Sequence, residues 1–370
     1  MDPALKISQG GKLEVSSKIK LTTENLTEVY TPGVAKISEA IAKDKQKAYD
    51  FTWKSRSVAI VSDGSAVLGL GNLGATPALP VMEAKAILFK ELAGVDAVPL
   101  VLDTQDPEEI VKIVEAIAPG FGGINLEDIA APNCFFVEEK LKKSLDIPVF
   151  HDDQWGTAIV VLAGLINALK WTKKDFRSVK TIISGAGAAG IAITRLLLKY
   201  GFENIIVYDS QGPLYKKRDG MNKMKEKIAE QTNLEIFKGG MKESLAGADI
   251  FVGVSRAGLL DRDSVEAMNQ KAIVFSLANP VPEIMPEEIK DGKAEVIATG
   301  RSDYPNQINN ALVFPGIFKG ALTKRTTLIT DEIKINIAKS LAFLVKTPTQ
   351  FEIIPKVIDD RVSRAVANCF

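Results

Sequence analysis

The sequence is poor in the two residues that most often carry metal and acid–base chemistry in enzymes. Histidine occurs once, as His151, and cysteine twice, as Cys134 and Cys369. A single histidine excludes mechanisms that need a histidine pair or a Ser/His/Asp triad with its histidine elsewhere. Two cysteines are too few for a disulfide framework or a thiolate zinc site. Metal chemistry would therefore have to use carboxylates, and proton transfer would have to use Lys, Tyr, Asp or Glu.

The chain also lacks net charge and long apolar runs. Its 46 Lys and Arg residues balance 46 Asp and Glu residues, so nothing indicates the basic face that binds a nucleic-acid backbone, and we expect no nucleic-acid partner. No segment approaches the uninterrupted apolar stretch of a membrane span. The first residues, MDPALKISQGGKLEV, match neither a signal peptide nor a transit peptide. We therefore expect a cytoplasmic location without membrane contact.

Length and pattern predict two domains of the α/β class, because 370 residues exceed what one hydrophobic core usually serves. In the first half, short β-branched runs alternate with helical patterns. We predict strands at 57–61, 97–102, 122–126 and 147–150, and helices at 80–92, 107–118 and 134–144. Strands that alternate with helices form a parallel sheet with right-handed crossovers. Residues 1–155 are therefore predicted as one doubly wound domain.

The alternation restarts at residue 179, after an almost wholly apolar helix predicted at 157–169. We predict strands at 179–184, 204–208, 249–254, 272–277 and 295–299, with helices at 187–200 and 221–231. Two amphipathic helices, at 330–345 and 357–368, close the chain. Residues 156–370 are therefore predicted as a second doubly wound domain, of the Rossmann type, whose C-terminal helices could pack back on the first.

A glycine motif lies between the first strand and the first helix of this second domain. It consists of Gly185, Ala186, Gly187, Ala188, Ala189 and Gly190. In this context G-x-G-x-x-G is typical of dinucleotide binding: Gly185 permits a tight turn, Gly187 lets the backbone approach a pyrophosphate, and Gly190 allows close packing. The alternative is a glycine-rich turn without a ligand. We predict an NAD(P) site here.

Asp209 ends the next predicted strand, 19 residues after Gly190, where an acid would accept a hydrogen bond from the 2′-hydroxyl of the adenosine ribose. This position favours NAD over NADP, because a 2′-phosphate would be repelled. Lys216, Lys217 and Arg218 follow and could still bind that phosphate if their loop folds back. The alternative is that Asp209 only caps a turn.

Acidic residues follow two predicted strands of the first domain. Glu127 and Asp128 come after one strand, and Asp152 and Asp153 after another. Carboxyl ends of parallel strands share one edge of a sheet, so Glu127, Asp128 and Asp153 could meet there and bind a hard cation such as Mg²⁺ or Mn²⁺. The alternative is that Asp128 and Asp153 cap the helices that follow them.

Six blocks decide between these alternatives. They are YTPGVA (30–35), SDGSAVLGLGNLG (62–74), PVMEAK (80–85), NLED (125–128), HDDQWGT (151–157) and NNALVFPG (309–316). From about residue 20 onward, the chain resembles the short, prokaryotic-type malic enzymes. The resemblance implies oxidative decarboxylation of (S)-malate to pyruvate and CO₂ with reduction of NAD(P)⁺, with substrate and metal held by the first domain. It also implies a homodimer.

Carried over position by position, the resemblance implies that Glu127, Asp128 and Asp153 bind the metal. It implies that Lys85 takes the proton of the malate hydroxyl and contacts the substrate, and that Tyr30 protonates the product. Asp152 could orient Lys85. A lysine base must be neutral, so we expect burial and a nearby cation to lower the pKa of Lys85. Ala84, where many relatives have glycine, could shift this lysine.

The same resemblance points to three asparagines. Asn279 matches a position that contacts nicotinamide ribose and substrate, and Asn309 and Asn310 match contacts to a substrate carboxylate. Larger malic enzymes place an arginine for that carboxylate where this chain has Ala66. Arg301 is a candidate replacement, and equally a structural ion-pair partner.

Two other activities remain open. The chain could decarboxylate oxaloacetate, or convert malate to lactate with tightly bound NAD, using the same residues. It could also be a non-catalytic dinucleotide sensor, but retention of Tyr30, Lys85 and the acidic residues argues against this.

Overall fold

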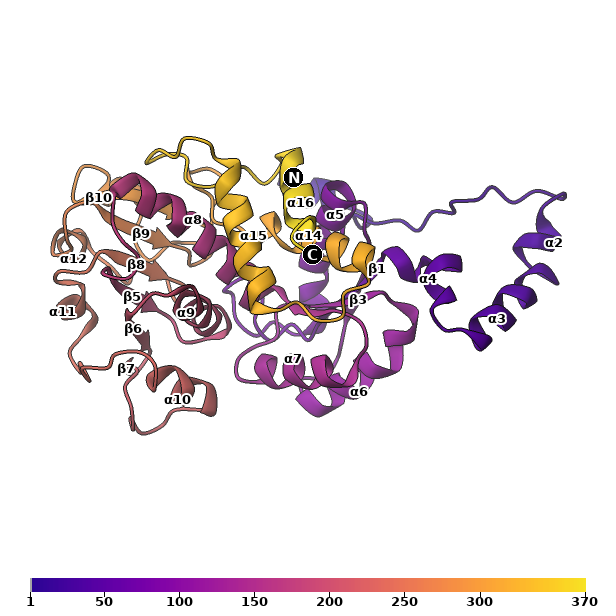
Figure 1. The fold of residues 1–370 in the computed structure, drawn as a ribbon, viewed down its shortest axis with the longest axis horizontal. Coiled ribbons are helices and arrows are strands. Elements are labelled where there is room, and N and C mark those ends of the chain that lie inside the picture. Colours follow the sequence, from indigo (N-terminus) through magenta and orange to yellow (C-terminus); the bar gives the residue numbers. More distant parts are fainter. Residues whose placement is uncertain (1) are drawn as a thin grey trace.

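Two separate sheets organise the computed structural model, which describes residues 2–370 (Figure 1). The first sheet is wholly parallel, with strand order β2-β1-β3-β4. Its strands are β1 (Ser57–Ser62), β2 (Asp96–Val101), β3 (Gly123–Leu126) and β4 (Val149–His151). Its helices are α5 (Ala75–Ala93), α6 (Pro107–Ile117) and α7 (Asn133–Ser144), with short 3₁₀ turns η1 (Trp53–Arg56) and η2 (Ala118–Gly120). Every residue of β1 and β3 is buried, as in parallel sheets covered on both faces.

The second sheet has the order β10-β9-β8-β5-β6-β7, and only the edge strand β7 is antiparallel. Its strands are β5 (Lys180–Ser184), β6 (Asn204–Asp209), β7 (Gly212–Pro213), β8 (Ile250–Gly253), β9 (Ala272–Ser276) and β10 (Ala294–Thr299). Its helices are α9 (Ala188–Tyr200), α10 (Lys223–Ala229), α11 (Met241–Leu245), α12 (Arg262–Glu266) and α13 (Pro286–Ile289). This is a Rossmann-type arrangement, and the predicted α/β class is confirmed.

Helix α8 (Thr157–Thr172) links the two sheets through the centre of the molecule (Figure 1). A π-helical turn, Asp152–Gly156, leads directly into it. Among the described residues, one helical run, Asp152–Thr172, is long and apolar enough to cross a membrane, but 78% of its most apolar window is buried. The run therefore has the character of a core helix.

The last helices, α14 (Phe314–Lys324), α15 (Asp331–Leu344) and α16 (Asp360–Ala367), follow the 3₁₀ turn η4 (Asn310–Leu312). The centre of the Phe89 ring on α5 lies 4.7 Å from the centre of the Phe314 ring and 5.5 Å from the centre of the Phe318 ring. Helix α14 therefore packs back into the core of the first sheet, although it follows the second sheet in sequence. The boundary at residue 155 stays a prediction.

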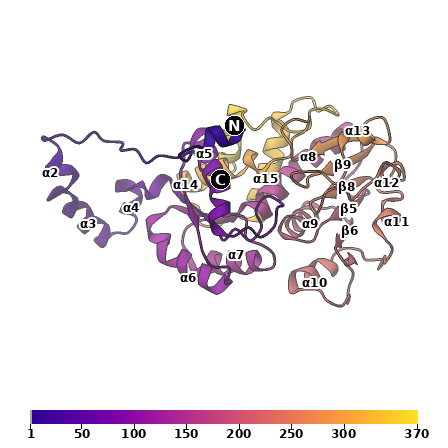
Figure 2. The same ribbon diagram turned by 180° about the vertical axis from the view of Figure 1, so that it is seen from behind.

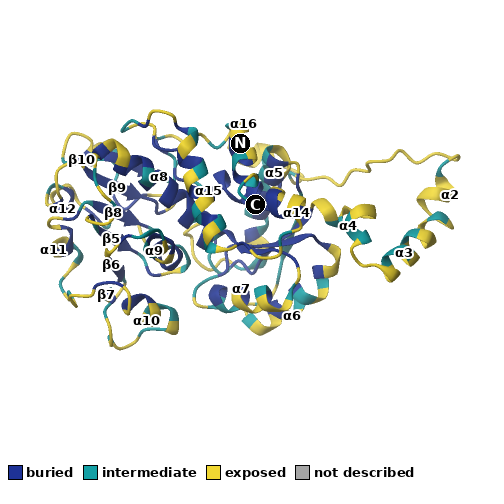
Figure 3. Cartoon of the chain, viewed as in Figure 1, coloured by how far each residue is buried: buried dark blue, intermediate teal, exposed yellow. Residues whose placement is uncertain are grey.

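The N-terminal arm, residues 20–51, stands away from this body (Figures 1 and 2). It contains α2 (Leu26–Val29), α3 (Gly33–Lys43) and α4 (Lys47–Phe51), and none of these helices has a buried residue. Figure 3 draws the arm mostly in the colour of exposed residues, whereas the sheets and α8 are buried. The short helix α1 (Pro3–Ser8) precedes the arm but lies against the body.

Candidate active site

A cavity of about 680 Å³ lies between the two sheets and is lined from both of them. The loops after β1 and β3 and the π-helical turn after β4 form one wall, and the first turn of α9 and the loops after β8 and β9 form the other. Both walls are at the carboxyl ends of parallel strands. In each sheet the strand order reverses there, between β1 and β3 and between β5 and β8. Open α/β sheets bind their ligands at such points.

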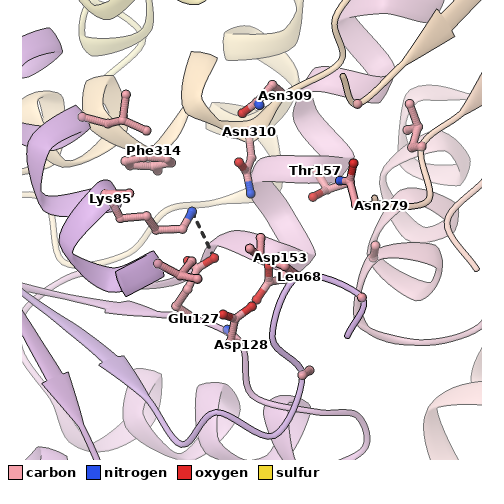
Figure 4. Close-up of a pocket in the computed structure, with 18 of the residues that line it drawn as sticks. Leu68, Lys85, Glu127, Asp128, Asp153, Thr157, Asn279, Asn309, Asn310 and Phe314 are labelled. Atoms are coloured by element: carbon pink, nitrogen blue, oxygen red, sulfur yellow. Dashed lines mark hydrogen bonds and ion pairs between the residues drawn. The ribbon is translucent and has the colours of Figure 1, made fainter. Parts of the chain in front are cut away.

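Glu127, Asp128 and Asp153 meet on the first wall (Figure 4). Each offers one carboxylate oxygen, and these three atoms lie within 4.8 Å of one another. The backbone N–H of Asp128 donates to Oδ2 of Asp153 over 2.8 Å, which ties the loop after β3 to the π-helical turn. Asp128 has a positive φ of 54°, an uncommon conformation that Asp tolerates better than most residues.

Burial and mutual repulsion make this group costly to keep ionised. Burial, followed by repulsion from Asp153, raises the pKa of Glu127 well above its usual value and that of Asp128 to about 7. Oδ2 of Asp128 is buried and has no hydrogen-bond partner among the described residues. Hard oxygen donors with uncompensated charge suit a divalent cation such as Mg²⁺ or Mn²⁺.

These acids do not cap the helices that follow. The residue preceding α7 is Pro132 and the residue preceding α8 is Gly156, and neither makes a side-chain cap. The helix-cap alternative for Asp128 and Asp153 is therefore wrong.

Lys85 points from α5 toward the acidic group (Figure 4). Its side chain is 9% exposed, and its Nζ donates to Asp152 and lies 3.0 Å from Oε1 of Glu127. The same Nζ lies 4.2 Å from the centre of the Phe314 ring. Burial alone would lower the pKa of Lys85, but attraction by Asp152, Glu127 and Asp153 outweighs it, so the pKa is raised. Without a cation, Lys85 is therefore held in its charged form, contrary to what a base requires.

Asp152 is fully buried, and its partner is Lys85. Burial, opposed by Lys85, raises the pKa of Asp152 to about 6. The π-helical turn places Asp152 on Lys85 and turns the next residue, Asp153, toward Asp128. Gly156 allows this turn, because an added Cβ would lie 1.8 Å from Oδ1 of Asp152. Single π-helical turns often occur at functional sites.

The three predicted asparagines also line the cavity. Asn310 is directed toward Lys85 and Asp153, and Asn279 lies on the opposite side beside Thr157 (Figure 4). Oδ1 of Asn309 accepts a hydrogen bond of 2.9 Å from the backbone N–H of Ala311. Asn309 therefore caps the turn η4, and its amide N–H₂ can still donate to a ligand.

The glycine loop has the geometry that its motif predicts. An added Cβ at Gly190 would lie 1.7 Å from the carbonyl oxygen of Gly185, and Gly185 itself has φ +113° and abuts Val254. Nothing lies within 4 Å of an added Cβ at Gly187, so the backbone there is open to a ligand. Ala186 is buried in the loop, and Ala188 and Ala189 open α9, with Ala189 lining the cavity.

Asp209 ends β6 beside this loop, as predicted, but its oxygens are already occupied. Oδ1 accepts from Nη1 of Arg218 (2.8 Å) and from the backbone N–H of Gln211 (2.9 Å). Oδ2 accepts from Nη2 of Arg218 and from Nζ of Lys225 (2.7 Å). Burial opposes ionisation, but these donors outweigh it and lower the pKa of Asp209. A carboxylate has about four acceptor sites, so none is left for a ribose hydroxyl.

Comparisons with known proteins agree with this geometry. Residues 10–142 match the family model "Malic enzyme, N-terminal domain", and residues 155–369 match "Malic enzyme, NAD binding domain". The chain belongs to the malic enzyme family. It is 51% identical to the bifunctional malic/malolactic enzyme of Bacillus subtilis, covering 98% of this chain and 89% of that one. It is 53% identical to the NAD-dependent malic enzyme of Geobacillus stearothermophilus, covering 96% and 75%.

Solved structures give the same result for the fold. The NAD-dependent malic enzyme of Thermotoga maritima superposes with a TM-score of 0.95 at 45% identity, over 99% of this chain and 98% of that one. The malic enzyme of Pyrococcus horikoshii superposes with a TM-score of 0.93 at 48% identity, over 97% and 86%. The chain is therefore an NAD(P)-dependent oxidoreductase of the malic enzyme family.

One residue that the malic enzyme resemblance places in the site lies elsewhere in this chain. Tyr30 follows α2 on the N-terminal arm, its exposed fraction is 68%, and it does not line the cavity that contains Lys85. The arm carries it away from the body in both views (Figures 1 and 2). Within one chain, Tyr30 is therefore not brought to the other predicted residues.

Arg301 does not replace the arginine that larger malic enzymes place near the position of Ala66. Its Nε and Nη2 bind both carboxylate oxygens of Asp303 at 2.9 and 2.6 Å, and it does not line the cavity. Besides Lys85, the cation that lines the cavity is Lys12, whose Nζ donates to the carbonyl of Pro80 over 3.0 Å. Sequence reasoning missed Lys12, because it lies before the first of the six motif blocks, which begins at Tyr30.

Glu283 is a further buried acid, and sequence reasoning missed it. It accepts from the backbone N–H groups of Ser255 (2.9 Å) and Ala278 (3.1 Å). It thereby joins the loops after β8 and β9, which line the cavity. Its fit is close, since an added Cβ at Gly253 would lie 2.3 Å from its carboxyl carbon.

Proposed function

We propose that the chain oxidises (S)-malate to pyruvate and CO₂ with reduction of NAD(P)⁺, and that it needs Mg²⁺ or Mn²⁺. The observation that carries this proposal is the shared cavity. It holds three clustered carboxylates and a buried lysine on one wall, and on the other Ala189 in the first turn of α9, directly after the open glycine loop. A hydroxy acid bound between the walls would have its C2 within reach of both a base and a nicotinamide.

Glu127, Asp128 and Asp153 would hold the cation, and the burial of Glu127 and Asp128, with one Asp128 oxygen left without a partner among the described residues, suits it. A bound divalent cation lowers the pKa of the malate hydroxyl and stabilises negative charge that develops on its oxygen. Asn310 and Asn279 would donate amide N–H groups to the substrate carboxylates without adding charge. Lys12 is a candidate partner for the second carboxylate, because it lines the same cavity.

Lys85 would take the proton of the malate C2 hydroxyl at its Nζ, and Asp152 would orient that Nζ through the hydrogen bond between them. The base must be neutral. When Glu127 and Asp153 are engaged by a cation, their attraction on Lys85 weakens and the effect of burial, which lowers its pKa, gains weight. Phe314 covers the lysine and helps to exclude water.

Tyr30 would protonate C3 of the product, and we propose that it does so from a second copy of the chain in a homodimer. A site without Tyr30 lacks the proton donor that the resemblance implies. The arm that bears Tyr30 also carries exposed apolar side chains, among them Leu26, Val29, Val34 and Phe51. Such a surface is typical of an interface between subunits, and a homodimer gives each arm a partner site.

For the cofactor, we propose that NAD is favoured but that NADP is also used. Asp209 disfavours a 2′-phosphate, yet Arg218 and Lys225 already bind this carboxylate. Arg218 or Lys225 could turn to bind the 2′-phosphate of NADP. With NAD, Asp209 could accept a hydrogen bond from the ribose hydroxyl only after Lys225 releases it. Relatives named NAD-dependent and NADP-dependent both occur.

A second candidate is a malolactic activity, because the relative in Bacillus subtilis is named a bifunctional malic/malolactic enzyme. Decarboxylation of oxaloacetate would use the same residues. A steady-state assay with malate, Mn²⁺ or Mg²⁺ and either NAD or NADP separates these activities. Accumulation of NADH or NADPH with pyruvate supports the proposal. CO₂ release with lactate and without reduced cofactor would contradict it in favour of malolactic chemistry. A cytoplasmic location stays a prediction.

A further inference from the structure

A second cavity, of about 610 Å³, lies behind the π-helical turn. Asp153 of this turn lines the active-site cavity, whereas Gln154 and Trp155 line the second one. Its other walls come from α7, α9, α10, α15 and the residues just before α15. The second cavity therefore joins elements of both sheets and is separated from the active site by a single helical turn.

Basic side chains from three different helices gather around Trp155 in this cavity. Nζ of Lys334 on α15 lies 3.5 Å from the centre of a Trp155 ring, Cζ of Arg195 on α9 lies 4.8 Å away, and Nζ of Lys142 on α7 lies 5.7 Å away. Lys227 of α10 lines the same cavity. Cations that converge from separate elements repel one another, so their convergence requires compensation.

The acids of the cavity compensate only part of this charge. Oε1 of Glu138 pairs with Lys142, and Oε2 accepts from the Trp155 indole at 3.1 Å. Asp331 pairs with Lys334, and Glu139 pairs with Lys143. Every lining carboxylate is thus engaged.

Two basic groups remain without a carboxylate. Among residues 2–370, no carboxylate lies within ion-pair distance of Arg195 or Lys227. Lys334 is only 3% exposed, and burial followed by repulsion from Lys142 lowers its pKa to about 8. Nε2 of Gln154, which is 1% exposed, has no acceptor among the described residues. Among the described residues, the cavity therefore contains a buried hydrogen-bond donor without an acceptor and two basic side chains without a paired carboxylate.

We propose that the second cavity binds a small polyanion, a phosphate-bearing or polycarboxylate metabolite, through Arg195 and Lys227 with help from Lys142, Lys334 and Gln154. Arginine and lysine favour such anions because of charge-assisted hydrogen bonds. An anion there would bridge α7 of the first sheet and α9 and α10 of the second. The anion would also contact the turn that carries Asp153, so its binding would be coupled to the active site.

The test uses the full chain without metal, titrated calorimetrically with inorganic pyrophosphate and, separately, with citrate. We expect at least one of them to bind. The double variant Arg195→Gln/Lys227→Gln should weaken binding by about tenfold or more, since it removes two charge-assisted contacts. Both side chains are exposed at the mouth of the cavity, so the fold and the basal malate activity should be unchanged.

Two matched variants test whether the anions bind at this cavity or are attracted by basic residues elsewhere on the surface. Arg364→Gln, which removes an exposed arginine of α16 outside the cavity, should bind like the wild type, and Arg195→Lys should retain most of the affinity. Binding of pyrophosphate alone identifies a phosphate ligand, and binding of citrate alone identifies a polycarboxylate. The proposal is overturned if neither anion binds, or if the double variant binds as tightly as the wild type.

Discussion

At the scale of single residues, the charge state of the Lys85 amine is set by the carboxylates around it and by its burial. Asp152 and Glu127 both contact it, and together with Asp153 they raise its pKa, although burial acts in the opposite direction. The same carboxylates, Glu127 and Asp153, belong to the acidic group that suits a cation. The charge state of the lysine and the occupancy of the metal site are therefore linked.

Lys85→Ala should lower kcat for malate oxidation by about a thousandfold or more, because it removes the proton acceptor. NAD affinity, measured by fluorescence titration, should be nearly unchanged. Lys90→Ala, an exposed lysine of the same helix α5, serves as the control and should keep normal turnover. Substantial residual turnover of Lys85→Ala would remove this residue from the role of base.

Cofactor choice gives a second test at this scale. Arg218→Ala should reduce kcat/KM with NADP by about tenfold, because a charged contact to the 2′-phosphate is lost. With NAD the change should be small, since Asp209 gains a free acceptor for the ribose hydroxyl. Equal losses with both cofactors would mean that Arg218 only holds its loop.

Sequence reasoning was strongest for residues at strand ends. Because β1, β3 and β4 are parallel, their carboxyl ends had to share an edge, and this brings Glu127, Asp128 and Asp153 together. It was weakest for Tyr30, because motif spacing does not give the direction of an exposed arm. For Arg301 two roles were left open, and the pairing with Asp303 confirms the structural one.

At the scale of elements, the sequence pattern predicted every strand of both sheets within a few residues except the short antiparallel edge strand β7, because buried parallel strands are short apolar runs. Helix α14 was missed. Pro315 and two glycines are poor helix formers, but these glycines let α14 lie closely against α16: an added Cβ at Gly316 would be 2.6 Å from Cβ of Val366. The π-helical turn at 152–156 was also missed, since it has no distinct periodicity.

Gly316→Ala should therefore destabilise the fold, even though alanine is the better helix former. The added methyl would also lie 2.9 Å from the carbonyl oxygen of Ser363, and overpacking of this kind costs about 1 to 3 kcal/mol. The free energy of unfolding, from urea denaturation, is the measurement. Gly120→Ala, where nothing lies within 4 Å of the new methyl, is the control. A Gly316→Ala chain as stable as the control would show that α14 and α16 can separate at no cost.

At the scale of the whole molecule, one chain has a body with an active-site cavity and an exposed arm with Tyr30. Lys85→Ala and Tyr30→Phe should each be nearly inactive alone. The two variants are then unfolded and refolded together, so that half of the dimers contain one chain of each. If each arm completes the partner's site, every mixed dimer has one complete site, and about one quarter of wild-type activity returns. If Tyr30 acts within its own chain, no activity returns.

Malate oxidation should depend on a divalent cation that Glu127, Asp128 and Asp153 hold together. The most direct measurement is a Mn²⁺ titration of malate-dependent NADH formation in the wild type and in Asp153→Asn, an almost isosteric change that removes one charge. The wild type should need Mn²⁺ for activity, and the variant should need at least about tenfold more for half-maximal rate. Metal-independent turnover of the wild type, or identical titrations of the two proteins, would show that this acidic group does not hold a cation needed for malate oxidation.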